Sequence, residues 1–335
     1  MGRCFLLRTF VALYLLPRAL YHLFMIFFYL MAALAVSFLI LGKAADTLII
    51  HIRSIGERLG VNTYFLGLLI GLFTSFPELA VGINAYAANA PVLSLGNLFG
   101  GIPVLLGFVL GLSVVLNRKM NTTGVKDGLA FVLAYLLLPL LLGLDGTIGA
   151  IDGLVLAGVY FLLVHAHYAR HRHKHGAEVR YAQRHNVLND LFLTVFSITV
   201  VLLMTNIIVR LTLQLANMLH VPEFLVGLLV LSIGTNLPEI AATFRSWKQR
   251  DSALALSIVL GSAMVNPLLI GIFSFLRTSH LAIGPQYYFL IASFVVLLAC
   301  TFLFVRSDAR LVRREGWMLL GLYAVYVFGQ AAVGG

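Results

Sequence analysis

Long apolar stretches, most of them close to 20 residues, alternate with short polar segments along most of the chain. An α-helix needs about 20 apolar residues to cross the hydrocarbon core of a bilayer. The pattern therefore predicts an all-α polytopic membrane protein with the lipid bilayer as its surroundings. We expect about ten spans, at 26–48, 63–87, 93–116, 128–143, 148–166, 189–214, 222–245, 252–276, 283–305 and 316–333.

Composition supports the same class. Apolar residues make up 61% of the chain and charged residues only 11%, and the mean hydropathy is +0.98. A water-soluble fold of this length would need more polar surface. The sequence shows no serine–histidine arrangement, phosphate-cradling glycine loop or nucleotide motif, so we expect neither an enzyme nor an ATP-driven pump, and no cofactor.

The net charge of +10 reports topology rather than a nucleic-acid partner. If the 166–188 loop lies in the cytoplasm, alternation places 18 of the 23 Lys and Arg residues on the cytoplasmic side. This asymmetry is the positive-inside bias. It predicts a multi-pass protein of the plasma membrane (the inner membrane of a cell) with both termini outside.

Two segments leave alternatives open. Residues 1–25 combine three arginines and Pro17 with apolar residues, which predicts an interfacial helix; the alternative is a further short span. The 166–188 loop is rich in histidine, and we interpret it as a solvated basic connector. The alternative is a metal or pH sensor, because imidazoles titrate near neutrality. The histidines of this region are His165, His167, His171, His173, His175 and His185.

Two lone glutamates beside prolines interrupt the apolar pattern. Glu78 is the only charged residue between Arg58 and Arg118, and no other charge accompanies Glu239 from Phe224 to Phe244. A carboxylate at the bilayer centre costs roughly 2.5–3.5 kcal/mol on insertion scales, so such residues usually serve an ion or substrate path. The alternative is a pair of proline-kinked packing helices with buried basic partners, but no Lys or Arg lies between Arg58 and Arg118 or from Phe224 to Phe244.

The two glutamate segments superimpose when the chain is shifted by 161 residues. Pro77 then falls on Pro238, Glu78 on Glu239, and Gly100 on Gly261. The connection after the first segment is uncharged, whereas the connection after the second carries Lys and Arg, so the copies should be inserted in opposite orientations. We expect two inverted five-helix repeats, as in secondary transporters. The first half covers 26–165 with its motif at 67–107, and the second covers 189–335 with its motif at 227–271.

The prolines also predict the chemistry of the site. Proline has no N–H, so Pro77 frees the carbonyl of Phe73 and Pro238 frees that of Gly234. Unpaired backbone at membrane depth is tolerated only where it lines a cavity or is buried in protein. Carbonyl, hydroxyl and carboxylate oxygens together form a hard ligand set, which suits Ca²⁺ or Na⁺.

These motifs resemble those of the sodium/calcium exchanger branch of the cation/Ca²⁺ antiporter superfamily. The resemblance rests on Thr-Ser-Phe-Pro-Glu at 74–78, Gly-Thr-Asn-Leu-Pro-Glu at 234–239, and the glycine motifs that begin at Gly96 and Gly261. It implies a secondary antiporter that exchanges Ca²⁺, or a similar divalent cation, for Na⁺ or H⁺ by alternating access. It also implies that the long first and sixth helices slide past the repeats.

The resemblance implies a set of cation ligands as well. Glu78 and Glu239 would be the central ligands, completed by the carbonyls of Thr74 and Thr235. The remaining candidates, on the flanks, are Ser75, Ser262, Asn236, Asn266 and the carbonyls of Gly71 and Ser232.

Some positions depart from the family pattern. Gly101 stands where serine is usual, Leu105 where an amide or acid is usual, Asn236 where serine is common, and Asn266 where aspartate is common. These departures keep two alternatives open. One is a monovalent cation/proton exchanger, and the other is a degenerate, non-transporting membrane sensor or scaffold.

Overall fold

The computed structural model describes residues 2–59, 73–122, 128–171, 187–249, 252–307 and 310–334. Helices account for nearly all of these residues. The first half contains α1 (Gly2–Arg58), α3 (Phe76–Ala87), α4 (Pro91–Pro103), η1 (Val104–Val109), α5 (Leu110–Asn117), α6 (Leu129–Leu142), η2 (Gly143–Asp145) and α7 (Ala150–His171). The second contains α8 (Val187–Leu219), α9 (Glu223–Val226), η3 (Gly227–Leu231), α10 (Ser232–Thr235), α11 (Leu237–Gln249), α12 (Ser252–Leu276), α13 (Pro285–Ser307) and α14 (Arg313–Gly334).

Four short strands form two antiparallel pairs between helices. β1 (Lys119–Asn121) pairs with β4 (Arg310–Val312), with Met120 opposite Leu311. β2 (Thr147–Ile148) pairs with β3 (Ser279–His280), with Ile148 opposite Ser279. Each pair ties a connection of the first half to one of the second.

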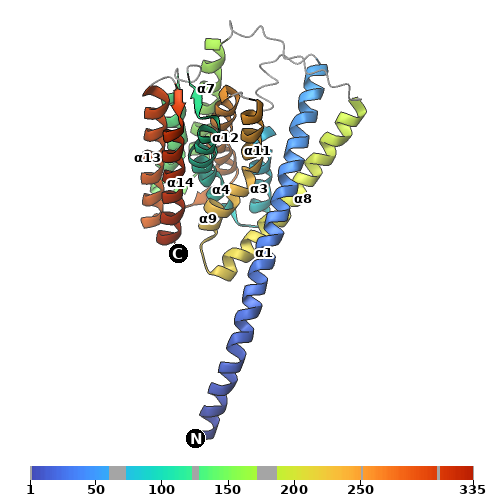
Figure 1. The fold of residues 1–335 in the computed structure, drawn as a ribbon, viewed down its shortest axis with the longest axis vertical. Helices are drawn as coiled ribbons and strands as arrows, with labels where there is room; N and C mark the ends of the chain where they lie inside the picture. Colours follow the sequence, from blue (N-terminus) through green and yellow to red (C-terminus); the bar gives the residue numbers. More distant parts are fainter. Residues whose placement is uncertain are drawn as a thin grey trace.

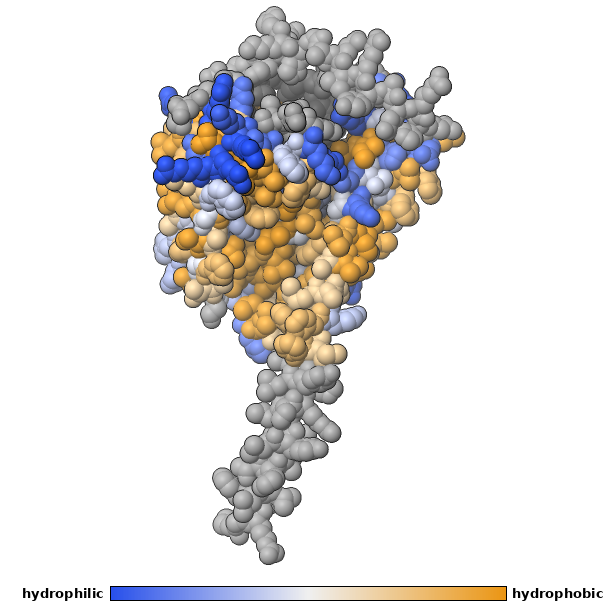
Figure 2. Space-filling model, viewed as in Figure 1, coloured by the Kyte–Doolittle hydropathy of each residue, from blue (hydrophilic) through white to orange (hydrophobic). Residues whose placement is uncertain are grey.

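The all-α membrane architecture predicted from the sequence is confirmed. Seven helices in the described residues are long and apolar enough to cross a membrane, and two shorter apolar helices lie at 129–145 and 150–166. Large apolar side chains such as Phe131, Ile151 and Phe328 point outward on the helices. Figure 2 shows apolar surface over most of the visible face of the body, with hydrophilic residues gathered toward one end. Such a surface is suited to contact with lipid chains.

The centre of the bundle is the rod formed by α4, η1 and α5, the most buried of the candidate spans. It packs against η3, α9, α12 and α14. η1 and η3 are π-helical, a geometry that occurs mostly as local bulges and often at functional sites. The sequence pattern did not predict either one.

α1 and α8 lie side by side along one edge of the bundle, and α13 and α14 lie at the opposite edge (Figure 1). A buried polar cluster joins α1 to the start of α8. The Asp190 carboxylate, which is fully buried, contacts His51 Nδ1 at 2.7 Å and accepts a hydrogen bond from Ser54 Oγ at 2.8 Å. Arg58 lies 3.5 Å from the same carboxylate. The pairing supplies a buried charge with the partners it needs.

Three sequence predictions fall partly outside the described residues or remain untested. α1 is continuous from Gly2 through Pro17 to Arg58, so the segment 1–25 joins the first span as one helix; its interfacial position stays a prediction. The span expected at 63–87 is described from Phe73 onward, and residues 172–186 of the His-rich loop lie outside the description.

Candidate cation site

Two helix breaks of the same geometry position the two glutamates. α3 begins at Phe76 after Ser75, whose backbone has φ −91° and ψ 17°. α10 ends at Thr235, and Asn236 has φ −86° and ψ 12° before α11 begins at Leu237. Each proline occupies the first turn of the following helix, where its missing N–H costs nothing. The helix break expected at each proline is therefore present just before it.

Each glutamate follows its proline in the first turn of a helix, where the helix dipole favours negative charge. Glu78 is 3% exposed and Glu239 is 2% exposed. The two carboxylates are close enough for their charges to interact, and Oε2 of each one has no hydrogen-bond partner. Of the ion pairs formed by described residues, none involves either glutamate. The structure thus brings the two acidic groups together.

Hydroxyl groups lie beside both carboxylates. Ser262 Oγ, from α12, donates a hydrogen bond to Glu239 Oε1 at 3.2 Å. Thr235 Oγ1 donates to the side-chain oxygen of Asn97 at 3.2 Å and also faces the Glu78 carboxyl group. Thr235 and Ser262 are both buried, so these hydroxyls orient the carboxylates without contact with water.

The other predicted ligands that the structure describes lie at or near the two breaks or on α12. Ser75 is buried and Thr74 is half-buried at the first break, whereas Gly71 lies outside the described residues. In the second break, Asn236 Nδ2 donates to the carbonyl of Ser232 at 2.8 Å. Asn266, on α12, is buried, and its Nδ2 has no partner.

Three contributors to the site did not appear among the predicted ligands. Asn97, from α4, joins the two halves through its bond to Thr235; its burial in an apolar helix was the available signal. Gly101 lies where the amides of Asn236 and Asn266 converge. The carboxylate of Asp46, on α1, is close enough for its charge to interact with that of Glu239. It also accepts hydrogen bonds from both terminal nitrogens of Arg245, at 2.8 and 2.9 Å.

The chemistry of this arrangement favours a hard cation. Two carboxylates, two hydroxyls and the side-chain oxygen of Asn97 are ligands of the kind that Ca²⁺ takes in proteins. Across the described ranges, no group of three or more His, Cys, Asp or Glu side chains could hold a metal ion. The two-carboxylate site would therefore depend on neutral oxygens for the rest of its coordination.

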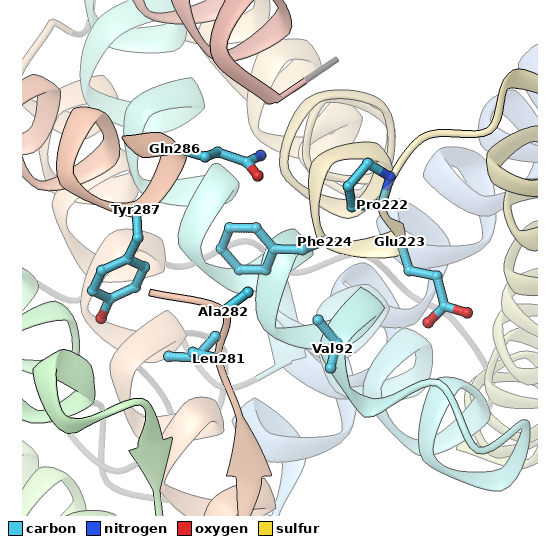
Figure 3. A pocket seen from close by; sticks show the side chains of 8 residues that line it. All are labelled: Val92, Pro222, Glu223, Phe224, Leu281, Ala282, Gln286 and Tyr287. Carbon is cyan, nitrogen blue, oxygen red and sulfur yellow. The ribbon is translucent and has the colours of Figure 1, made fainter. Parts of the chain in front are cut away.

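A separate cavity of about 300 Å³ opens near the starts of α4, α9 and α13 (Figure 3). Most of its lining is apolar, and the Glu223 and Gln286 side chains lie on different sides of it. None of the predicted cation ligands lines this cavity. Its walls are Val92, Pro222, Glu223, Phe224, Leu281, Ala282, Gln286 and Tyr287.

The chain is similar to known membrane proteins over nearly its whole length. The family described as sodium/calcium exchanger protein matches residues 29–168 and 190–332. An uncharacterized membrane protein of Methanocaldococcus jannaschii is 25% identical over 313 residues, which cover 89% of this chain and 98% of that protein. The sodium/calcium exchanger MaX1 of Methanosarcina acetivorans is 22% identical over 345 residues, with coverage of 89% and 97%.

Solved structures share the fold. The crystal structure of the H⁺/Ca²⁺ exchanger CAX matches with a TM-score of 0.70 and 15% identity, over 91% of this chain and 87% of that chain. A structure of the sodium-calcium exchanger NCX_Mj, soaked with Na⁺ and Sr²⁺, matches with a TM-score of 0.63 and 20% identity, over 90% and 98%. At these identities the likeness establishes a common architecture.

Proposed function

The chain belongs to the sodium/calcium exchanger protein family, and we propose that it is a secondary antiporter that exchanges Ca²⁺, or a similar divalent cation, for Na⁺ or H⁺. The observation that carries this proposal is the pair Glu78 and Glu239. Both are buried, each keeps one unpaired carboxylate oxygen, and their charges are close enough to interact. Two neighbouring carboxylates without a cationic partner are costly in an apolar interior, so they favour a bound cation.

The surrounding groups can complete a shell for the ion. Thr235 and Ser262 supply hydroxyl oxygens, and the two breaks supply main-chain carbonyls, among them those of Thr74 and Thr235. Ser75, Asn236, Asn266, Gly71 and Ser232 are proposed to shape the flanks. Because Ca²⁺ accepts six to eight oxygen ligands in flexible geometry, a shell built from both halves of the chain is suitable.

We infer that the two halves are inverted repeats of five helices each, about ten spans in all. The 161-residue offset of the motifs and the similar backbone angles at Ser75 and Asn236 support this. In such transporters the site lies where the repeats meet, and rocking or sliding of one part against the other alternates access. The halves would cover 26–165 and 189–335, joined by the loop 166–188.

The orientation in the membrane is part of the proposal. Arg58, Arg118, Arg245 and Arg310 all fall on the cytoplasmic side of this scheme, and this positive-inside bias supports the orientation. The proposal places both termini outside the plasma membrane and residues 1–25 at its surface.

Flux through reconstituted protein tests the function. Proteoliposomes loaded with ⁴⁵Ca²⁺ should release it when an inward Na⁺ or H⁺ gradient is imposed, and Glu78→Gln or Glu239→Gln should abolish the release. Glu57→Gln is the matched control, because Glu57 pairs with Arg53 on the surface of α1. Unchanged flux in both site variants would exclude this mechanism.

A monovalent cation/proton exchanger is the second candidate. It is favoured by Leu105, a buried side chain without oxygen, at the position that corresponds to Asn266 in the other half. Calorimetry that detects no divalent ion, together with proton-coupled Na⁺ or K⁺ flux, would support it over Ca²⁺ exchange.

A further inference from the structure

An exposed apolar stripe on α8 ends in a single arginine. The side chains of Phe192, Phe196, Leu203 and Ile207 are all exposed, and their spacing of four, seven and four residues places them on one face of the helix. Arg210, three residues after Ile207, continues this face and is also exposed. The apolar outer face of α8 therefore carries a permanent positive charge.

The position of Arg210 along α8 corresponds to the boundary of a bilayer. Asp190, whose cluster with Arg58 lies at the start of α8, precedes Arg210 by 20 residues, and no charged residue lies between them. Such a length of α-helix spans about 30 Å, which matches the thickness of the hydrocarbon core. A long basic side chain at this boundary extends toward the head groups. This spacing places Arg210 at the level of the lipid phosphates, in the leaflet at the Leu219 end of α8.

The guanidinium group of Arg210 is oriented by a hydrogen bond that leaves its two terminal nitrogens available. Its Nε donates to Oδ1 of Asn206, one turn earlier, at 3.0 Å. Within the described residues, no ion pair includes Arg210 and no hydrogen bond uses its terminal nitrogens. These nitrogens can donate in parallel to two oxygens of a phosphate, a geometry that an ammonium group cannot provide. Phosphate is the anion that a bilayer supplies at this depth.

A chain of side-chain amides connects Arg210 to α3. Because Nε of arginine can only donate, it fixes Oδ1 of Asn206 toward itself and Nδ2 away from itself. That Nδ2 donates to Oδ1 of Asn84 at 3.0 Å, and Nδ2 of Asn84 donates to Thr205 Oγ1 at 2.9 Å. Asn84 lies on α3, the helix whose first turn carries Glu78. The orientation of both amides, and with it this contact between α3 and α8, therefore depends on the donor at Arg210.

We propose that Arg210 binds the phosphate of a phospholipid in the leaflet at the Leu219 end of α8, and that the amides of Asn206 and Asn84 couple the bound lipid to α3. This leaflet is the outer one in the orientation proposed above. The bound lipid holds the amide chain in one orientation and thereby stabilises α3 against α8. The lipid contact itself does not depend on the antiport function, whereas any effect of it on transport rests on that function.

Lipid binding to the purified protein provides the first test. The probe is dioctanoylphosphatidylglycerol, a short-chain anionic phospholipid that can be titrated into detergent solution and counted on the protein by native mass spectrometry. We expect Arg210→Gln to weaken binding of the first lipid roughly fivefold, and Arg210→Lys to weaken it less. Arg277→Gln is the matched control, because it removes an exposed arginine at the same end of the molecule, where Arg277 contacts Asn89. This variant should bind the lipid as the wild type does.

Amide exchange in α3 provides the second test. In nanodiscs of wild-type protein, phosphatidylglycerol in place of phosphatidylcholine should slow hydrogen–deuterium exchange in α3 severalfold, and Arg210→Gln should abolish this difference between the two lipids. Asn206→Leu should abolish the difference but retain the binding of dioctanoylphosphatidylglycerol, because it breaks the amide chain and keeps the guanidinium group. Asn217→Ser, on the exposed surface of α8, should behave as the wild type.

Competition on wild-type protein identifies the ligand, also if Arg210→Gln does not fold. Neither dioctanoylglycerol, which has the same chains without the phosphate, nor inorganic phosphate should displace the phospholipid at equal concentration. Displacement by either one would overturn the proposed lipid site, and so would equal phospholipid binding by the wild type and Arg210→Gln. Exchange in wild-type α3 that is the same in both lipids would overturn the coupling. None of these measurements involves ion flux, so their failure leaves the antiport proposal intact, and absence of Ca²⁺ release leaves the lipid site intact.

Discussion

Gly96 and Gly227 bring two helix backbones into direct contact at the centre of the bundle. A β-carbon on Gly227 would lie 3.2 Å from the Cα of Gly96 and would overlap the carbonyl oxygen of Leu93; one on Gly96 would overlap the carbonyl oxygen of Phe224. Glycine permits this approach because it has no side chain. The contact holds α4 against α9 and η3, and thereby brings Asn97 to Thr235.

Gly227→Ala should therefore disturb both stability and the site. The added methyl group has backbone as its neighbour, which cannot move aside as a side chain can. Overpacking of this kind costs about 1–3 kcal/mol or more, so we expect a lower melting temperature in detergent and weaker Ca²⁺ binding. Gly158→Ala is the control, because nothing lies within 4 Å of a β-carbon there. Equal melting temperatures for the two variants would contradict this account.

Ser262→Ala should weaken divalent-ion binding without loss of the fold. The substitution removes the hydroxyl that donates to Glu239 Oε1. Hydrogen bonds to charged groups contribute about 1.5–3 kcal/mol, which corresponds to an affinity loss of roughly 10- to 100-fold by calorimetry. Ser274→Ala, on the same helix, removes a buried hydroxyl that has no partner, and its affinity for Ca²⁺ should stay at the wild-type value.

Arg245→Gln should loosen α1 from α11 with little change in stability. The Asp46–Arg245 pair is partly exposed, so its loss should cost less than about 1 kcal/mol. Hydrogen–deuterium exchange around Arg245, in the second half of α11, should nevertheless rise, because the pair joins two different helices. Arg53→Gln breaks an ion pair within α1 alone and should leave α11 protected. Unchanged exchange in both variants would mean that the Asp46 contact does not restrain α11.

Asp190→Asn should destabilise the protein more than a comparable surface substitution. The amide keeps the shape of the carboxylate but loses the charge and one of the acceptors that face His51, Ser54 and Arg58. We expect about 1–3 kcal/mol of lost stability, measured as a lower unfolding midpoint in denaturant. Asp145→Asn, at an exposed turn, supplies the reference, and a midpoint no lower than that reference would refute the expectation.

The sequence was sufficient for the features that depend on local pattern. The apolar stretches predicted the all-helical membrane architecture, with seven candidate spans in the described residues, and the paired prolines predicted both helix breaks with a glutamate after each. Features that depend on distances between helices could not be predicted in the same way. The convergence of Asn236 and Asn266 over Gly101 needs α12, α11 and α4 to be placed together. In the sequence it appears only as three departures from a family pattern.

The N-terminal helix is a second feature that the local sequence pattern did not predict. Pro17 and the arginines around it predict a segment at 1–25 separate from the first span, yet α1 runs unbroken from Gly2 to Arg58. Proline removes one hydrogen bond and usually kinks a helix, but its ring alone does not end one. The π-helical turns η1 and η3 were equally unforeseen, since nothing in the apolar period of either segment marks an extra residue in a turn.

The buried contact of His51 with Asp190 has a mechanical consequence. Because it fastens α1 to the beginning of α8, neither helix can shift along the membrane normal alone without separating a buried acid from its partners. If the chain works by the proposed antiport mechanism, spin labels on α1 and α8 should therefore report one constant separation in all of its states. Labels that pair either helix with α12 should instead show two populations of distances.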